Sequence, residues 1–411
     1  EPDVALKLRG AVDAPGFPIV ERWRAGAGEA PPVLPLAGRT LMGGRIDEII
    51  AKAGERLDEG EIVTLFEATG PDAGRVMEAA DALRHEAVGD AVTYVINRNI
   101  NYTNICSYRC GFCAFSKGTA KALRGPAYKL DLEEVGRRAA EAQARGATEV
   151  CLQGGIHPDY DGHTYLSIVR TVRDAAPGIH VHAFSPLEIA HGASTLGMEL
   201  EPYLAMLKEA GLSTLPGTAA EVLHEEVRAI ICPDKVSTDE WVAVMRAAHR
   251  VGLKSTATIM FGHVDEYRHW ARHLTVVRGL QEETGGFTEF VPLPFVHMEA
   301  PMWRKGKARS GPSFREALLM QAVARIALHG AIGNIQASWV KLGEQGVVAA
   351  LGAGVNDLGG VLMDESITRA AGGAHGQFFD VERMHRTAET AGRYARQRTT
   401  LYGSVEQEVA A

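Results

Sequence analysis

Three of the five cysteines in this chain lie within eight residues, and their spacing has a clear chemical meaning. Cys106, Cys110 and Cys113 form a CxxxCxxC array that is followed by Ala-Phe-Ser. A closed structural zinc or iron site normally takes four ligands, so three thiolates leave one metal position open for another molecule. Two alternatives are a zinc knuckle that borrows a fourth ligand and thiols that are simply buried. Cys151 and Cys232 have no partner at such a spacing, and we expect both to be buried.

The composition is that of a globular protein with one large or two modest domains. The 411 residues are 46% hydrophobic and 23% charged, and the formal net charge is −8. Lys and Arg are scattered without a basic stripe, so nucleic acid is not an expected partner. No apolar run approaches the roughly 18 residues that span a membrane. Clustered cysteines fit a reducing compartment, and we expect the cytoplasm.

Three regions follow one another along the chain. Residues 1–40 lack sustained periodicity and predict an extended arm or linker. Apolar residues at helical spacing predict a helical lead-in over 41–92. Residues 93–403 predict a barrel with a C-terminal extension. Because the first residue is Glu1 and not Met, we expect a processed, trimmed or excised chain.

Short β-rich runs alternate with amphipathic helical stretches after residue 92, and this predicts an α/β fold, a (β/α)8 TIM-type barrel. A six-stranded partial barrel is the alternative. The cysteine array follows the first strand, so it lies on a loop at the carboxyl end of the barrel, where such barrels carry their sites. The expected strands are 99–103, 149–153, 179–184, 213–215, 255–260, 287–291, 334–338 and 355–358.

Several expected strands have one apolar edge and one polar edge. The outer face of a barrel packs against helices, so the polar edges should point into the lumen and form a chamber for a hydrogen-bonding substrate. The alternative is that each polar group bonds to another part of the protein or is solvated at a strand end. For His263 and Asp357, a solvated loop residue and a helix cap are the respective alternatives. The candidate lumen residues are Gln153, His182, Thr258, His263, Glu289, Gln336, Ser338 and Asp357.

Further candidates for ligand binding close the second, third and fourth expected strands. Two glycines after the second strand allow the backbone to approach a ligand closely. A serine and a glutamate follow the third strand, and a threonine and a glutamate follow the fourth. These residues are Gly154, Gly155, Ser185, Glu188, Thr218 and Glu221.

Together, the array and these loops resemble the radical S-adenosylmethionine (SAM) enzymes. The resemblance implies that the three cysteines hold a 4Fe–4S cluster, whose fourth iron is chelated by SAM. It also implies that Phe112 packs near the adenine and that the glycine backbone holds the methionine amino group of SAM. For Glu221 the two alternatives, a position near SAM and a position in the first turn of a helix, are equal. The implied cofactor-binding residues are Phe112, Gly154, Gly155, Ser185, Glu188, Thr218 and Glu221.

Within that superfamily, the sequence resembles the tyrosine-using half of FO synthase from about residue 93 to 402. The resemblance rests on RNINYTNIC, CGFCAFSKG, TEVCLQGGIHP, HVHAFSPLEI, GFTEFVPLPFVHMEAP, NIQASWVKLG and RQRTTLYG. It implies a transferase that cleaves L-tyrosine at Cα–Cβ with a SAM-derived radical. The 4-hydroxybenzyl radical then adds to carbon 5 of 5-amino-6-(D-ribitylamino)uracil. The other products are 2-iminoacetate, 5′-deoxyadenosine and methionine.

The implied partners are the two substrates and an electron donor. A second radical SAM half, which some organisms fuse to this one, is a further partner that the sequence leaves open. This chain has one array and should catalyse one step. One alternative is an aminofutalosine synthase or futalosine cyclase of menaquinone synthesis. An alternative of another class is a non-catalytic scaffold protein that binds zinc.

Overall fold

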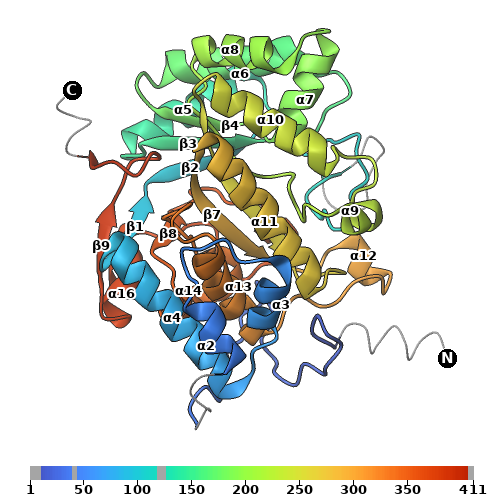
Figure 1. Cartoon of the computed structure of the whole chain (residues 1–411). Coiled ribbons are helices and arrows are strands. Elements are labelled where there is room, and N and C mark those ends of the chain that lie inside the picture. Colours follow the sequence, from blue (N-terminus) through green and yellow to red (C-terminus); the bar gives the residue numbers. More distant parts are fainter. Residues whose placement is uncertain (1–10, 39–43, 118–125, 406–411) are drawn as a thin grey trace.

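Six parallel strands pair in chain order and form most of the wall of an inner barrel (Figure 1). The computed structural model describes residues 11–38, 44–117 and 126–405, so Gly118 of the SKG segment and parts of the expected arm lie outside it. The six strands are β2 (Asn97–Asn101), β3 (Glu149–Gln153), β4 (His180–Ala183), β5 (Thr214–Leu215), β6 (Lys254–Phe261) and β7 (Phe287–Pro294).

A second, three-stranded sheet continues the wall in the order β8-β1-β9. Its strands are β1 (Ala91–Val95), β8 (Asp357–Gly360) and β9 (Tyr394–Gln397). Isolated bridges from Phe290 to Ile335 and from Gln336 to Asp357 lead from β7 to β8. β1 runs on into β2 after Ile96 alone, which completes the circuit. The TIM-type α/β fold is therefore confirmed, although the predicted strand over 334–338 is reduced to bridges.

Helices cover the outside of this wall, and their sequences explain where they begin. In α5 (Leu132–Ala144) the Asp131 side chain accepts the Glu134 backbone N–H at 2.8 Å, so Asp131 is the predicted N-cap. The helices that follow are α6 (Gly162–Ala175), α7 (Pro186–Thr195), α8 (Leu200–Ala210), α9 (Glu225–Ile231), α10 (Thr238–Arg250), α11 (Tyr267–Thr284), α12 (Pro301–Arg304), α13 (Phe314–Ala327), α14 (Trp339–Leu351), α15 (Ile367–Ala370) and α16 (Val381–Thr390), and α15 lines the cavity inside the barrel.

The N-terminal region packs against the barrel. It forms α2 (Arg45–Ile50), α3 (Glu59–Phe66) and α4 (Gly70–Val88), so the predicted lead-in is helical. α4 packs on α13, and α3 packs on α11 (Figure 1). The described part of the arm is extended but not free, because Trp23 is 1% exposed with its ring 5.0 Å from that of Phe314. No helix in the described ranges is long and apolar enough to cross a membrane.

Candidate active site

A cavity of about 440 Å³ lies at the carboxyl ends of the barrel strands, and its size is typical of small-molecule sites. It brings together sixteen of the eighteen residues that the sequence singled out. The other two, His263 and Asp357, are not part of its lining. The predicted residues that line it are Cys106, Cys110, Phe112, Cys113, Gln153, Gly154, Gly155, His182, Ser185, Glu188, Thr218, Glu221, Thr258, Glu289, Gln336 and Ser338.

Backbone hydrogen bonds hold the cysteine loop between distant parts of the chain. The Gly111 N–H donates to the Ile231 carbonyl at the end of α9 (2.7 Å), and the Met302 N–H of α12 donates to the Gly111 carbonyl (2.8 Å). On the other side, the Ser107 N–H donates to the Ile156 carbonyl (2.8 Å). Because these bonds fix the loop backbone, its side chains are presented to the cavity in a set arrangement.

Two of the three loop thiols accept a backbone N–H, as ligands of an iron–sulfur cluster often do. Each is a free cysteine. The Ile156 N–H donates to Cys106 Sγ and the Ser116 N–H donates to Cys113 Sγ, both at 3.4 Å. Such N–H···S bonds stabilise thiolates and tune the potential of a cluster. All three sulfurs line the same cavity.

Close packing explains both glycines of the turn after β3. A Cβ atom at Gly154 would lie 2.3 Å from the Tyr102 ring, and one at Gly155 would lie 2.3 Å from the Ile105 carbonyl oxygen. The Gly155 N–H also donates to the Thr103 carbonyl at 2.9 Å. The turn therefore lies against the cysteine loop, and the two segments form one wall of the cavity.

We expect Gly155→Ala to push the glycine turn and the cysteine loop apart. The new methyl group meets backbone, which cannot rotate away as a side chain can, so the turn or the cysteine loop must shift. Affinity for SAM should fall by about tenfold or more, as equilibrium dialysis of the iron-loaded protein would show. Gly333→Ala is the control, because its φ is not positive and a Cβ atom there meets nothing within 4 Å. The same SAM affinity in Gly155→Ala and wild type would contradict the prediction.

Glu188 lies beside the turn, but its carboxylate is engaged by the protein itself. Oε2 accepts the Ser185 N–H at 2.7 Å and the Ser185 hydroxyl at 2.5 Å, which completes the capping box of α7. Oε1 accepts the Tyr102 hydroxyl and, at 3.2 Å, the Gly154 N–H. Since Glu188 is 2% exposed and its bonds hold the Gly154 N–H and the Tyr102 hydroxyl, it positions the glycine turn, and its contact with SAM stays a prediction.

Glu221 and Thr218 follow β5 and face the cysteine loop across the cavity. Glu221 Oε1 pairs with Lys235 Nζ at 2.7 Å, and this ammonium lies 5.6 Å from the centre of the Phe112 ring. Glu221 precedes α9, so the alternative of a first-turn helix residue is wrong. The Thr218 hydroxyl is buried and has no hydrogen-bond partner among the described residues. It is therefore available to a polar ligand.

A network of charged side chains lies deeper in the lumen. Glu289 of β7 accepts the Tyr402 hydroxyl at 2.6 Å and an Arg398 N–H at 3.5 Å, both on Oε2. Burial raises the pKa of Glu289 to about 7, against the lowering effect of Arg398, and the carboxylates of Asp357 and Glu149 raise it further. A carboxyl group that is partly protonated near neutral pH can donate or accept a hydrogen bond.

This raised pKa should make stability depend on pH in a defined direction. Glu289 has an ordinary pKa of 4.5 in the unfolded chain, so between pH 4.5 and about 7 the folded protein binds more protons. Its contribution to stability is therefore lost as pH rises through that window. We expect the thermal midpoint of the wild type to fall, relative to that of Glu289→Gln, as pH is raised from 5.5 to 8. Parallel midpoint profiles would contradict this, and Glu283→Gln, on an exposed pair with Arg246, is the control.

His182 shares this part of the lumen, and its surroundings keep it neutral. Its Nδ1 lies 2.7 Å from the Thr214 hydroxyl, and burial lowers the pKa of the ring despite the nearby Glu149. Thr258 donates its hydroxyl to the Gly217 carbonyl at 2.7 Å. Both side chains line the cavity, so each contributes polar atoms to its surface.

Two predicted substrate-binding residues are placed elsewhere by the fold. Asp357 is fully buried and accepts bonds from Arg398 Nε (2.6 Å), the Gly359 N–H (2.6 Å) and the Thr93 hydroxyl. His263 is also fully buried, with Nε2 3.0 Å from the Met260 carbonyl and Nδ1 accepting the Val264 N–H. Internal partners therefore satisfy both, and we leave them out of the substrate-binding set.

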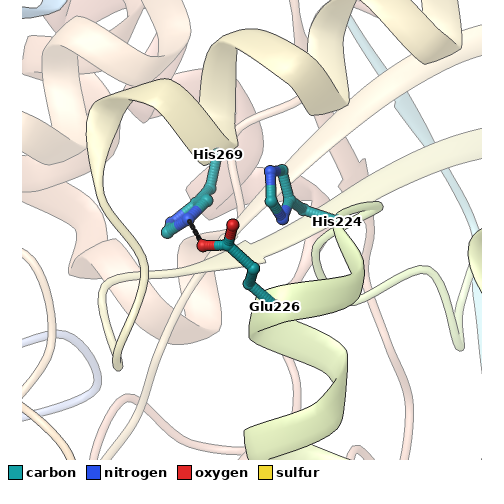
Figure 2. Close-up of side chains that lie close together, drawn as sticks. All are labelled: His224, Glu226 and His269. Carbon is teal, nitrogen blue, oxygen red and sulfur yellow. Dashed lines mark ion pairs between the residues drawn. The ribbon is translucent and has the colours of Figure 1, made fainter.

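His224, Glu226 and His269 form a second polar cluster, outside the barrel, with ligand-type atoms within 4.8 Å of one another (Figure 2). His269 Nδ1 accepts the Glu266 N–H at 2.9 Å, so the neutral ring carries its proton on Nε2, which faces Glu226 at 3.5 Å. Glu226 in turn pairs with Arg268 at 2.8 Å. A metal would have to displace that proton and break the cap, so the cluster is better explained as the N-terminal cap of α11.

Three cations of the cavity were missed at the sequence level: Lys235, Lys341 and Arg398. Lys341 and Arg398 lie in two of the segments that carry the family resemblance, but no spacing marked them. Lys235 lies between α9 and α10 in a segment without a motif. Cys151, expected to be buried, lies on β3 and lines the cavity, whereas Cys232 is buried as expected.

Two sequence families match the chain. The Radical SAM superfamily matches residues 100–276, and the CofH/MqnC C-terminal region matches residues 284–410. The chain is 49% identical over 330 residues to the 5-amino-6-(D-ribitylamino)uracil–L-tyrosine 4-hydroxyphenyl transferase of Methanocaldococcus jannaschii, covering 80% of this chain and 91% of that protein. It is 51% identical over 354 residues to the FO synthase of Nocardia farcinica, covering 86% of this chain and 41% of that protein.

Solved structures share the fold at low sequence identity. Methylornithine synthase superposes with a TM-score of 0.65 at 20% identity, covering 86% of this chain and 97% of that one. HydG, a maturase of the FeFe-hydrogenase, gives a TM-score of 0.67 at 16% identity and covers 87% and 77%. At these identities the comparison speaks for the barrel alone. The chain spans about two fifths of the length of the FO synthases that it matches.

Proposed function

The chain belongs to the radical SAM superfamily and, within it, to the family of FO synthases and tyrosine 4-hydroxyphenyl transferases, and on this basis we propose that it is the tyrosine-using transferase of deazaflavin synthesis. It would cleave L-tyrosine between Cα and Cβ and join the 4-hydroxybenzyl group to carbon 5 of 5-amino-6-(D-ribitylamino)uracil. The other products would be 2-iminoacetate, 5′-deoxyadenosine and methionine. An electron donor and a second radical SAM half are the protein partners that we propose.

One observation supports this proposal above the others: three free thiols and a set of polar lumen side chains line the same cavity. Cys106, Cys110 and Cys113 would hold a 4Fe–4S cluster. When bound, the cluster and SAM together supply a carbon radical inside the cavity. Free thiols in the described chain also favour a reducing compartment, so we propose the cytoplasm.

The protein's own residues would bind, orient and shield the reactants. The glycine turn, held by Glu188 and packed on the cysteine loop, would present its backbone to the amino group of SAM. The buried Thr218 hydroxyl has no hydrogen-bond partner among the described residues, so it could bond to a polar group of SAM. Holding SAM and two substrates at reacting distance is the main contribution that such a site can make to rate.

The polar side chains deeper in the lumen would bind the substrates. His182, Thr258, Gln336 and Ser338 line the cavity and offer hydrogen-bonding atoms from three different segments of the wall. The aminouracil carries ring N–H groups, carbonyls and hydroxyls, which such a surface can bind in a fixed orientation. Glu289, protonated in part near neutral pH, adds a group that can bind either a donor or an acceptor.

An anaerobic assay tests the function. The protein is reconstituted with iron and sulfide, reduced and given SAM, first with tyrosine and then with tyrosine and the aminouracil. We expect 5′-deoxyadenosine and an adduct that carries a hydroxybenzyl group, both detected by mass. Deoxyadenosine without that adduct would redirect the assignment to the menaquinone substrates. No deoxyadenosine from a protein with an intact, reducible cluster would overturn the proposal, and zinc in place of iron would favour a scaffold.

A further inference from the structure

The charged side chains that line the cavity differ in how well the protein neutralises them. Lys235 pairs with Glu221, and Arg398 pairs with Asp357 outside the lining. Among the acids, Glu149 accepts bonds from Asn97 (2.8 Å) and Thr400 (2.7 Å), and Glu188 and Glu289 have the partners described above. The remaining charged lining residues are Glu365 and Lys341.

Lys341 is the exception among the cations of this lining. Its Nζ donates to the Thr368 hydroxyl at 2.9 Å, and in the described chain no carboxylate forms an ion pair with it. Glu365, the acid that acts on it electrostatically, is occupied by the backbone N–H groups of Thr368 (2.7 Å) and Arg369 (3.4 Å). An ammonium group has three N–H donors, so two remain for a ligand.

The Lys341 side chain is half-buried at the cavity, and its backbone is fixed in place. Burial lowers the pKa of Lys341, which is the sign of a cation that lacks enough compensating charge. Its backbone is held on both sides, because the Lys341 N–H donates to the Ser338 carbonyl (3.0 Å) and the Gly26 N–H donates to the Lys341 carbonyl (2.6 Å). An anion that enters the cavity would supply the missing partner without moving the helix.

The position of Lys341 in the barrel indicates which anion this is. The segments expected to contact SAM follow β3, β4 and β5, whereas Lys341 follows the bridge segment at Ile335 and Gln336. Counted around the wall, with β1 and β2 taken as one continuous strand, that segment is four places from β4 in either direction, so it lies across the lumen. The segments expected to contact SAM therefore face Lys341 across the lumen, and the aminouracil has no carboxylate.

We propose that Lys341 binds the α-carboxylate of L-tyrosine, with the Thr368 hydroxyl holding the ammonium toward it. This inference rests on the proposed function and names the substrate group that this part of the site recognises. A charge-assisted bond of this kind both anchors the amino acid and fixes which end of it points toward SAM. Ser338, which lines the cavity one helical turn away, would supply a neighbouring hydroxyl.

The test compares L-tyrosine with tyramine, which lacks the carboxylate. Binding of each is measured by anaerobic equilibrium dialysis on the cluster-loaded protein with SAM and without reductant, so that no turnover occurs. We expect the wild type to prefer tyrosine over tyramine by about tenfold or more. Lys341→Gln should lose most of that preference because tyrosine binds more weakly while tyramine is little changed. Lys341→Arg, which keeps the charge, should retain part of it.

Lys235→Gln is the matched control, because it removes a second cavity ammonium that already has a carboxylate partner. It should leave the ratio of tyrosine to tyramine affinity unchanged. An unchanged ratio in Lys341→Gln, with wild type still binding tyrosine, would overturn this inference and leave the proposed function standing. Weaker SAM binding in Lys341→Gln, with tyrosine unaffected, would also overturn it and assign the lysine to the cofactor. Failure of the wild type to bind tyrosine would remove both proposals.

Discussion

Replacing Cys106, Cys110 or Cys113 with alanine is expected to abolish both iron loading and adduct formation. The loop offers three thiols and no fourth, so no spare ligand within the array can take over. Loss of an outer partner of a metal ligand typically costs about 10–100-fold in metal affinity or activity, and loss of a ligand itself should cost more. Iron and sulfide analysis, with the visible absorbance of the cluster, measures the first effect, and product mass measures the second.

Cys151→Ser is the control for this series. Cys151 lines the same cavity but lies on β3, outside the loop, and its Sγ accepts the Gln153 side-chain N–H at 3.7 Å. Iron content should therefore remain at the wild-type level. Loss of iron in Cys151→Ser, or a full cluster in any of the three loop variants, would show that the ligand set is wrong.

Asp357→Ala is expected to have the largest effect on stability of any single charge change in the lumen. Asp357 and Arg398 are both buried and share two contacts, at 2.6 and 3.0 Å. Removing one partner of a buried pair leaves the other charge uncompensated, which typically costs about 3–5 kcal/mol. Arg398 cannot relieve this by losing its proton, because an arginine stays charged at any ordinary pH.

Thermal unfolding of the cluster-loaded protein under anaerobic conditions measures this effect. The midpoint of Asp357→Ala should fall by many degrees, and Asp357→Asn, which keeps the shape without the charge, should lie between it and the wild type. Glu283→Ala breaks an exposed pair with Arg246 and should change the midpoint very little, because solvent screens such a pair. An Asp357→Ala midpoint close to that of Glu283→Ala would show that the pair is not needed for folding.

Periodicity was enough to predict the barrel, and the exceptions have physical reasons. The strand over 149–153 was predicted at its observed bounds, because its apolar and polar residues alternate cleanly. β1 was missed because all five of its residues are buried, so it has no alternation. β9 was missed for the opposite reason: its residues are polar or half-exposed, and it lies at the edge of its sheet.

β7 extends further than the predicted strand because the backbone nitrogens of its prolines face away from β6. The Phe290 N–H donates to the Asn334 carbonyl, away from β6, whereas the Phe295 N–H donates to the Phe261 carbonyl of β6. By alternation, Pro292 and Pro294 have their nitrogens on the Phe290 side, beyond the last bridge to Ile335. The missing N–H groups thus remove no ladder bond, and the strand continues.

The candidate site was predictable to the level of loops but not of individual polar atoms. Motif spacing located the cysteines and the glycine turn, because close packing and metal binding demand particular residues at fixed intervals. For Glu188 and Asp357 the decisive partners, Tyr102 and Arg398, come from distant segments of the chain. Sequence alone cannot show whether a buried carboxylate already has its hydrogen-bond partners. It also gave no sign that Lys341 has no carboxylate partner within the described chain.

The anchoring of Gly111 sets an order of events during biosynthesis. Its two backbone partners, Ile231 and Met302, are synthesised long after the cysteines themselves. While the ribosome is still making the second half of the barrel, the emerging thiols have neither the carbonyl nor the amide that shapes their loop. The loop can therefore take the conformation described above only once the chain has been synthesised beyond Met302.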